Sequence, residues 1–280
     1  NIGDDLNFWI WPKIFGSDFF KDKKNAFLGI GSILITDSDY IEKAEKHELK
    51  IVFGTGVRSI EQVFDFDSTW DISFLRGPFS SYIVTGSLHN YITDSAYFIS
   101  LLPEFNNYKK FKKKHKISFI PYYKSVDLVD WEKCCEILGW NLILPTGGDV
   151  EDFLTQVAES ESVIAEAMHG AIIADALRVP WKRLKFNAHL YEGEIVSEFK
   201  WKDWLYSINT KEHTPITFLP NILKTKYKIF PFLKKDKYIR DFVSQMKGRE
   251  IKFSLSSDHR FDEIIQQLEI KKKEIIKKYL

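Results

Sequence analysis

The residues of this chain that can do chemistry stand where an apolar run gives way to a glycine turn. The apolar run 162–167 leads into Met168-His169-Gly170, and an alanine- and isoleucine-rich helix is expected over 171–177. Histidine donates or accepts a proton near neutral pH, and the free N–H groups at a helix start favour an anion. His169 is therefore suited to acid–base chemistry on an anionic substrate. The alternative is a core histidine that bonds a backbone carbonyl.

Arg76 stands in a second such place, after the apolar run 72–75 and before Gly77 and Pro78. Proline is favoured in the first turn of a helix, so Arg76 is expected at a strand end, pointing towards a ligand cleft. A guanidinium grips a carboxylate or a phosphate with two hydrogen bonds. We expect Arg76 to bind an anion and its loss to change stability little. The alternative is a surface ion pair.

Two further turns carry weaker signals. The segment 54–58 contains a Gly-x-Gly turn after an apolar run, which is a weak sign of phosphate binding. The segment 1–7 places two adjacent acids at the start of an expected helix, where they either cap the helix or bind sugar hydroxyls and act as a base. The candidate substrate-binding residues of these turns are Gly54, Gly56, Arg58, Asp4, Asp5 and Asn7.

Strand and helix patterns alternate through 116–186, with short connections between them. Such alternation predicts a parallel sheet with crossover helices, and ligands bind at the carboxyl ends of its strands. A noisier alternation covers 1–103 and predicts a second α/β half. We expect an α/β fold with two Rossmann-like halves facing a cleft, an arrangement called GT-B-like. The expected domains are 1–103, 104–220 and a basic helical extension at 221–280.

Two lysine-rich segments lie outside these patterns. The run 109–116 is interpreted as a solvated helix face or linker, with a phosphate- or membrane-facing surface as the alternative. The C-terminal lysines precede a final helix whose apolar face is expected to dock onto the protein; the alternative is a peripheral contact with anionic lipid. The residues concerned are Lys224, Lys226, Lys228, Lys234, Lys235 and Lys237, then Ile264, Ile265, Leu268, Ile275 and Ile276.

Composition excludes several classes of protein. The net charge of +1 argues against a nucleic-acid binder. The only two cysteines, Cys134 and Cys135, are adjacent, which suits neither a disulfide between distant segments nor the usual metal spacing. No apolar run approaches the roughly 20 residues that span a bilayer, and no signal peptide is visible. We expect a reduced, cytoplasmic protein without a metal site.

Several blocks together resemble the polysaccharide pyruvyl transferase family, especially its exopolysaccharide ketal branch. In order they are NIGDDLN, GIGSIL, VFGTGV, LRGP, ITDSA, AEAMHGAIIADALRVPW and KWKDW at 200–204. The resemblance covers roughly 1–205, and the block around His169 is its most specific part. It implies a GT-B-like fold and phosphoenolpyruvate as the donor substrate, with no other cofactor. It also implies that Arg76 and His169 act on the donor.

The same resemblance suggests further substrate-binding residues. They are Tyr122, Lys124, Glu166 and Gly170. Tyr122 stands where the family often has a histidine, and Asp94-Ser95-Ala96 replaces an aspartate-proline-alanine block. These departures bear on acceptor specificity more than on the reaction type. Glu166 is also a candidate base, as are Asp4 and Asp5.

The implied function is transfer of a pyruvate ketal from phosphoenolpyruvate to a sugar. The acceptor belongs to a bacterial surface or capsular polysaccharide or to its lipid-linked precursor, and the reaction takes place in the cytoplasm or at the inner face of the plasma membrane. One alternative is a nucleotide-sugar glycosyltransferase of the same architecture, since fold alone does not fix function. The other is a non-catalytic scaffold of polysaccharide assembly.

Overall fold

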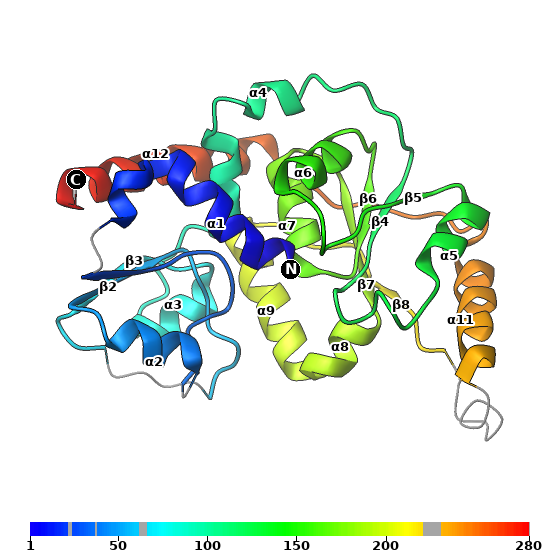
Figure 1. Cartoon of the computed structure of the whole chain (residues 1–280), viewed down its shortest axis with the longest axis horizontal. Coiled ribbons are helices and arrows are strands. Elements are labelled where there is room, and N and C mark those ends of the chain that lie inside the picture. Colours follow the sequence, from blue (N-terminus) through cyan, green and yellow to red (C-terminus); the bar gives the residue numbers. More distant parts are fainter. Residues whose placement is uncertain (22–23, 37, 62–65, 221–230, 280) are drawn as a thin grey trace. The chain divides into compact units, whose positions relative to one another are not determined.

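The computed structural model describes residues 1–21, 24–36, 38–61, 66–220 and 231–279. It is an α/β protein with two sheets of parallel strands, and the chain divides into two compact units (Figure 1). Unit 1 comprises Asn1, 107–193 and 212–255. Unit 2 comprises 2–106, 194–211 and 256–280.

These units differ from the domains expected from sequence. The change from unit 2 to unit 1 at 106–107 lies close to the expected boundary at 103–104. After it the chain returns to unit 2 twice, at 194–211 and at 256–280. The expected extension at 221–280 is therefore not a separate part of the molecule, because its described residues are shared between the two units.

Unit 1 contains a five-stranded sheet in the order β5-β4-β6-β7-β8. The strands are β4 (Ser118–Ile120), β5 (Asn141–Leu142), β6 (Val163–Ala165), β7 (Trp181–Lys185) and β8 (Ile216–Thr217). Its helices are α5 (Trp131–Leu138), α6 (Val150–Ala158), α7 (Met168–Ala176), α8 (Asn187–Glu192) and α11 (Pro231–Met246). In this doubly wound order the first strand, β4, lies between the second, β5, and the third, β6. The strand order therefore reverses between β4 and β6, which is where open α/β sheets bind ligands.

Local capping signals explain the helix ends of unit 1. Asp149 caps α6 as expected, accepting a hydrogen bond from the Glu151 N–H at 3.0 Å. Gly139 ends α5 with a left-handed φ of 66°, which glycine adopts without strain. The residue pattern predicts a helix from Asp127, but Asp130 is the residue that caps α5, because its carboxylate accepts from the Lys133 N–H at 2.9 Å.

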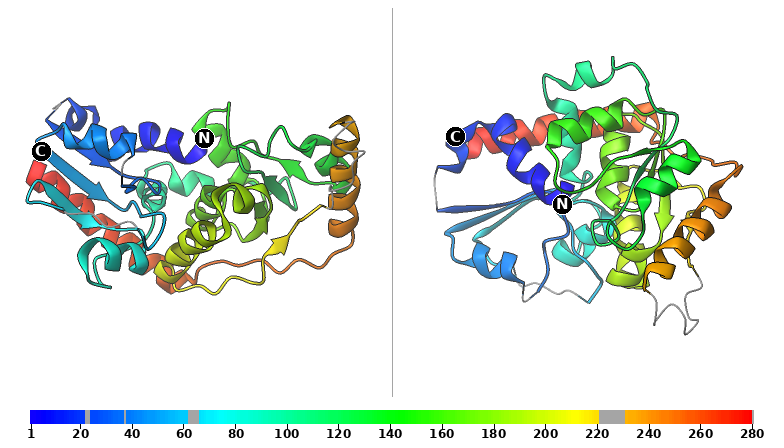
Figure 2. Two further views of the ribbon diagram at one scale, coloured as in Figure 1. Left: turned by 90° about the horizontal axis from the view of Figure 1, so that it is seen from below. Right: turned by 45° about the vertical axis from the view of Figure 1, so that its right-hand side comes forward.

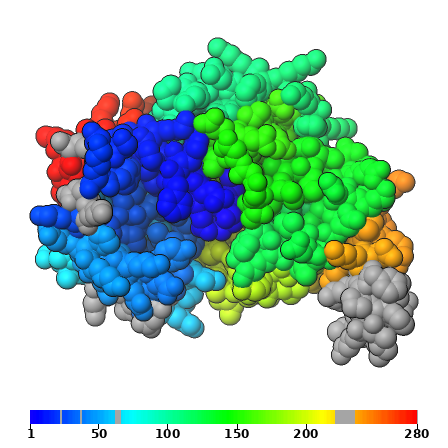
Figure 3. All heavy atoms as spheres, in the orientation of Figure 1, coloured from blue at the N-terminus to red at the C-terminus, as the bar shows by residue number. Residues whose placement is uncertain are grey.

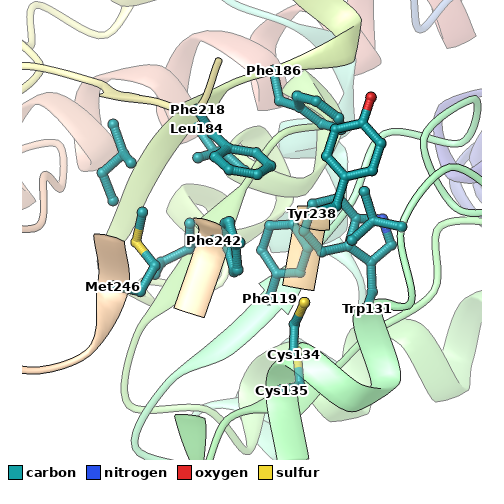
Figure 4. Packing of buried hydrophobic residues seen from close by; sticks show 13 residues of the cluster. Phe119, Trp131, Cys134, Cys135, Leu184, Phe186, Phe218, Tyr238, Phe242 and Met246 are labelled. Atoms are coloured by element: carbon teal, nitrogen blue, oxygen red, sulfur yellow. The ribbon is translucent and has the colours of Figure 1, made fainter. Parts of the chain in front are cut away.

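The sheet of unit 1 is covered on both faces. Phe119 and Ile164 belong to an apolar cluster to which α5 and α11 contribute (Figure 4). Their neighbours Ile120 and Ala165 lie closest to Gly170 of α7. Because successive side chains of a strand point to opposite faces, α7 covers one face, and α5 and α11 cover the other. Figure 2 shows α11 beside α5 in both views.

The two cysteines are part of this cluster. Cys134 is fully buried and Cys135 is 2% exposed (Figure 4). Burial raises the pKa of each thiol to about 12. Since the thiolate is the reactive form, iodoacetamide at pH 8 should modify neither cysteine in the folded protein and both after denaturation. Mass spectrometry of the two samples checks this, and rapid labelling of the folded protein would contradict the packing of α5.

Unit 2 contains a three-stranded parallel sheet in the order β1-β2-β3. The strands are β1 (Asn25–Leu28), β2 (Leu49–Phe53) and β3 (Trp70–Phe74). Its helices are α1 (Ile2–Phe15), η1 (Ser17–Phe20), α2 (Asp39–Glu45), α3 (Pro78–Thr85), η2 (Ser95–Leu101), α9 (Glu194–Ser207) and α12 (Asp258–Tyr279). The short helix α4 (Phe105–Tyr108) lies at the change to unit 1. The apolar run at 91–93 forms a single bridge from Tyr91 to Leu75 and no strand.

The two faces of this sheet differ in composition. One face is aromatic: Trp11 of α1 lies 5.0 Å from Phe27 and 5.8 Å from Phe53, measured between ring centroids. The other face is aliphatic, with Leu28 and Val52 in one apolar cluster with residues of α2, α3 and α9. The alternation along β1 and β2 therefore packs α1 against one face and α2 and α3 against the other (Figure 1).

The final helix, α12, docks onto unit 2. Its apolar residues Ile264, Leu268 and Ile275 are buried, and Phe261 stacks on Phe105 with ring centroids 6.2 Å apart. Lys278 pairs with Asp71 of β3 at 2.9 Å. The docking prediction is confirmed, and the face considered for lipid contact is occupied by the protein itself.

The C-terminal lysines are only partly described. Lys224, Lys226 and Lys228 lie outside the described residues, and so does the side chain of Lys234. Lys235 and Lys237 are on α11, where Lys237 pairs with Asp241 at 2.5 Å.

The lysine-rich run 109–116 is largely exposed and contains no helix, in line with a linker; it lies within the projecting atoms at the top of Figure 3. It is tied to the end of α6, because Lys113 donates to the Ala158 carbonyl at 2.7 Å and Lys114 pairs with Glu159 at 2.5 Å. Among the described residues, no helix has both the length and the apolar character needed to cross a membrane.

Candidate active site

The candidate active site lies at the carboxyl edge of the sheet of unit 1. Strands β4 and β6 are parallel neighbours, with Ile120 opposite Ala165 at their ends. The loop after β4 carries Tyr122 and Lys124, and the turn after β6 leads through Glu166 to α7. The strand order brings these two turns together at the point where a ligand is expected.

His169 is the second residue of α7 and lies in its first turn. The helix has no side-chain cap, because its N-cap residue is Ala167. Gly170 allows α7 to pack closely on the sheet. A Cβ at this position would lie 3.1 Å from Ile120 Cδ1 and 3.3 Å from Ala165 Cβ. Gly170 therefore lets α7 sit directly against β4 and β6, while its contact with substrate stays a prediction. The half-buried His169 is held at the edge of the sheet by this packing.

Glu166 connects three turns at this edge. It is 2% exposed, and its Oε2 accepts hydrogen bonds from the Tyr122 N–H at 2.8 Å and from the Ser125 hydroxyl. Its Oε1 accepts from the Ala188 N–H of α8 at 2.9 Å. Burial raises the pKa of Glu166, and these hydrogen bonds oppose the rise. Glu166 thus joins the loops after β4, β6 and β7, which favours a positioning role; the role of base considered from sequence stays a prediction.

We therefore expect Glu166→Ala to change the stability of the folded protein more than the catalytic step. It leaves several donors at the sheet edge without an acceptor, and each such loss costs about 1–3 kcal/mol when the donor stays buried. We expect the free energy of unfolding to fall by about 2–4 kcal/mol in urea melts. A variant that loses turnover and keeps wild-type stability would instead make Glu166 a base.

A lysine and three tyrosines form a cluster at the same edge. The Lys124 ammonium lies 3.5 Å from the Tyr191 ring centroid and 5.5 Å from that of Tyr123. The Tyr122 ring packs against Tyr123 at 4.7 Å between centroids. Burial, followed by the charge of Glu192, raises the pKa of Tyr122, which keeps its hydroxyl protonated and able to donate. Tyr123 and Tyr191 were not among the residues predicted from sequence; the available signal was an aromatic residue shortly after each of the strands β4 and β7.

Arg76 does not point into a cleft: the expected orientation is wrong. The side chain is 1% exposed within unit 2. Its Nε donates to Asp203 Oδ2 at 3.1 Å, and its terminal nitrogens donate to the Ser32 hydroxyl and to the Val57 carbonyl. The alternative of an ion pair holds, although the pair is buried and not on the surface. The guanidinium nitrogens thus donate to groups of the protein itself and not to a ligand.

Asp203 also takes the place of an anion at the start of α3. Its Oδ1 accepts from the N–H groups of Phe79 at 2.9 Å and Ser80 at 3.0 Å, and its Oδ2 accepts from the Ser80 hydroxyl at 2.6 Å. A carboxylate there satisfies the free donors of the helix. The signal was present in the KWKDW block, which contains Asp203, but its partner Arg76 is 127 residues away in sequence.

The glycine turn 54–56 is shaped by this buried network. A Cβ on Gly56 would lie 2.5 Å from the Arg76 guanidinium carbon, and one on Gly54 would overlap the Ser95 hydroxyl. Gly54 also has a φ of 81°, which favours glycine. Both glycines are explained by internal packing, and the phosphate-binding role suggested by the Gly-x-Gly pattern has no support in this geometry. Arg58, at the end of the same segment, is half-buried.

The N-terminal candidates lie on α1 of unit 2. Asn7 fixes this helix to the end of β1, because its Oδ1 accepts from the Ile30 N–H at 2.8 Å and its Nδ2 donates to the Ile30 carbonyl at 3.0 Å. Asp4 and Asp5 are exposed in the first turn of α1. Asp4 and Asn7 also line a mainly apolar cavity of about 700 Å³ beside β1.

The predicted site residues therefore form separate groups. Unit 1 brings together Tyr122, Lys124, Glu166, His169 and Gly170 at one sheet edge. Unit 2 places Gly56 against Arg76, which pairs with Asp203, and Gly54 against Ser95; the α1 residues belong to the same unit.

The chain is similar to a curated protein, the succinoglycan biosynthesis protein ExoV of Rhizobium meliloti strain 1021. The two are 33% identical over 208 residues, which is 74% of this chain and 61% of the relative. The chain thus matches about three fifths of the relative's length. No family model matches the chain, and no solved structure matches it. The similarity to this relative supports the resemblance of the sequence blocks to the polysaccharide pyruvyl transferase family.

Proposed function

We propose that this protein transfers an enolpyruvyl unit from phosphoenolpyruvate to a sugar and closes it into a cyclic pyruvate ketal. The observation that carries the proposal is the place of His169, in the first turn of α7 at the reversal point of the sheet order. An acid–base side chain in the first turn of a helix, the end that favours anions, suits a substrate that carries both a carboxylate and a phosphate.

The proposed chemistry begins with a proton. His169 protonates the methylene carbon of phosphoenolpyruvate, which leaves a cationic centre at the carbon that bears the phosphate ester. A sugar hydroxyl attacks that carbon and loses its proton to a base. The bond from carbon to the phosphate oxygen then breaks, phosphate leaves, and a second sugar hydroxyl adds and loses its proton. The products are the ketal and inorganic phosphate, and no redox cofactor or metal takes part.

The acceptor is proposed to be a sugar of a bacterial surface polysaccharide or of its lipid-linked precursor. The relative is named for succinoglycan biosynthesis, which supports a polysaccharide substrate. The proposal includes a GT-B-like arrangement with unit 2 as the acceptor side, because both units are parallel α/β structures. Asp4 and Asp5 of that unit and Glu166 of unit 1 are the candidates for the base, and the reaction is assigned to the cytoplasm or the inner membrane face.

Phosphate release from phosphoenolpyruvate across a panel of glycan acceptors tests the proposal. We expect release that depends on the acceptor, together with an acceptor mass gain that corresponds to a ketal. Consumption of a nucleotide sugar in the same panel, with no use of phosphoenolpyruvate, would indicate the glycosyltransferase alternative. Binding of glycans without turnover of either donor would indicate a scaffold.

A further inference from the structure

The donor of the proposed reaction needs a cation, and the structure changes which residue supplies it. Phosphoenolpyruvate carries a carboxylate and a phosphate, and proteins bind such groups with charged donors. Arg76 was the residue expected from sequence, but it is 1% exposed in unit 2 and bonded to Asp203. A cation at the carboxyl edge of the unit 1 sheet itself is the candidate considered in its place.

Lys124 stands at this edge, four residues after the end of β4. Its ammonium lies 3.5 Å from the Tyr191 ring centroid, a cation–π contact that orients the charge. Tyr191 is 58% exposed and Tyr123 is 37% exposed, so the cluster is open to solvent on the side of the tyrosines. The hydrogen bond to Tyr191, above all, raises the pKa of Lys124, and the ammonium stays charged at neutral pH.

Hydrogen bonds fix the backbone around Lys124. The Lys124 carbonyl accepts from Asn187 Nδ2 at 3.3 Å, and the buried carboxylate of Glu166 bonds both the Tyr122 N–H and the Ala188 N–H. These bonds tie the loop after β4 to α8, which carries Tyr191. A flexible lysine is thus given a defined position beside the turn that leads to His169.

We infer that Lys124 binds the carboxylate or the phosphate of the donor, and that Tyr191 and Tyr123 position its ammonium group for this. The inference rests on the proposed function and deepens it. It assigns the binding of the donor's anionic group to Lys124, which lies at the same sheet edge as His169, and no longer to Arg76. Tyr191 and Tyr123 act through Lys124 and are positioning residues.

Calorimetric titration of the full chain with phosphoenolpyruvate, inorganic phosphate and pyruvate tests the inference. We expect Lys124→Met to weaken phosphoenolpyruvate binding at least tenfold and Lys124→Arg to restore part of it. The control is Lys133→Met, an exposed lysine on α5 paired with Glu136, which should bind like wild type. Loss of phosphate binding alone, or of pyruvate binding alone, identifies which anionic group Lys124 holds.

The tyrosines are tested by steady-state kinetics. Tyr191→Phe keeps the ring and should raise the KM for phosphoenolpyruvate only slightly, whereas Tyr191→Leu should raise it several-fold with a smaller change in kcat. An equal fall in kcat for both variants, with unchanged KM, would contradict a positioning role.

The outcomes separate the inference from the proposed function. If Lys124→Met binds phosphoenolpyruvate as tightly as wild type, the inference is overturned and the proposed function stands. If wild type releases no phosphate from phosphoenolpyruvate but binds phosphate or pyruvate through Lys124, the proposed function fails and the anion site stands. If wild type binds none of the three, both are overturned.

Discussion

His169→Gln should lower turnover by roughly 10²–10⁴-fold, the range typical of losing a general acid or base. Glutamine keeps hydrogen-bonding capacity at this place in the first turn of α7 but cannot transfer a proton near neutral pH. Stability should change little, since the half-buried His169 lies at the edge of the sheet. Phosphate release and ketal formation, measured for both proteins under the same conditions, give the effect.

A matched control is His259→Gln, because the His259 side chain is 84% exposed on α12. It should leave both turnover and melting temperature unchanged. A folded His169→Gln variant that keeps near-normal turnover would show that His169 is structural, and the proposed mechanism would then be wrong.

Asp203→Ala should lower the free energy of unfolding by about 3–5 kcal/mol, the cost typical of leaving one partner of a buried ion pair uncompensated. The variant leaves the buried Arg76 guanidinium without its carboxylate partner. It also leaves three hydrogen-bond donors at the start of α3 without their acceptor. The effect follows from urea or thermal unfolding. This expectation replaces the one based on sequence alone, in which loss of the Arg76 pair had little effect on stability.

Two comparisons sharpen that measurement. Glu136→Ala breaks the exposed pair with Lys133 and should change stability by no more than about 0.5 kcal/mol. The double variant Arg76→Met with Asp203→Leu should lose less than the sum of the two single losses, because an apolar pair replaces an isolated charge. Wild-type stability of Asp203→Ala would contradict the buried network.

Local signals in the sequence were sufficient to predict most of the helices and strands. Asp149 and Gly139 act through neighbouring backbone groups, and the strand at 49–53 is found where its apolar residues indicate. Such features depend on a few consecutive residues, so they are visible in one sequence.

The site was predictable only in part. The edge with His169 and Glu166 follows from the alternation of strands and helices, which is regular from 116 to 186. The partner of Arg76 was not predictable, because Asp203 reaches it across 127 residues of chain and from a different helix. The glycine turn at 54–56 was misread for the same reason, since the side chain that requires Gly56 comes from the next strand end.

The way the chain passes between the two units has a consequence for synthesis on the ribosome. Unit 2 contains the first described strands, yet Asp203 and the whole of α12 also belong to it. The N-terminal sheet therefore emerges long before the carboxylate that neutralises Arg76 and before Lys278 and Tyr279, which bond Asp71. Contacts of such long sequence separation slow folding. The nascent chain must carry an incomplete unit 2, with a charged arginine and part of an aromatic core uncovered, until residues 258–279 have also been made.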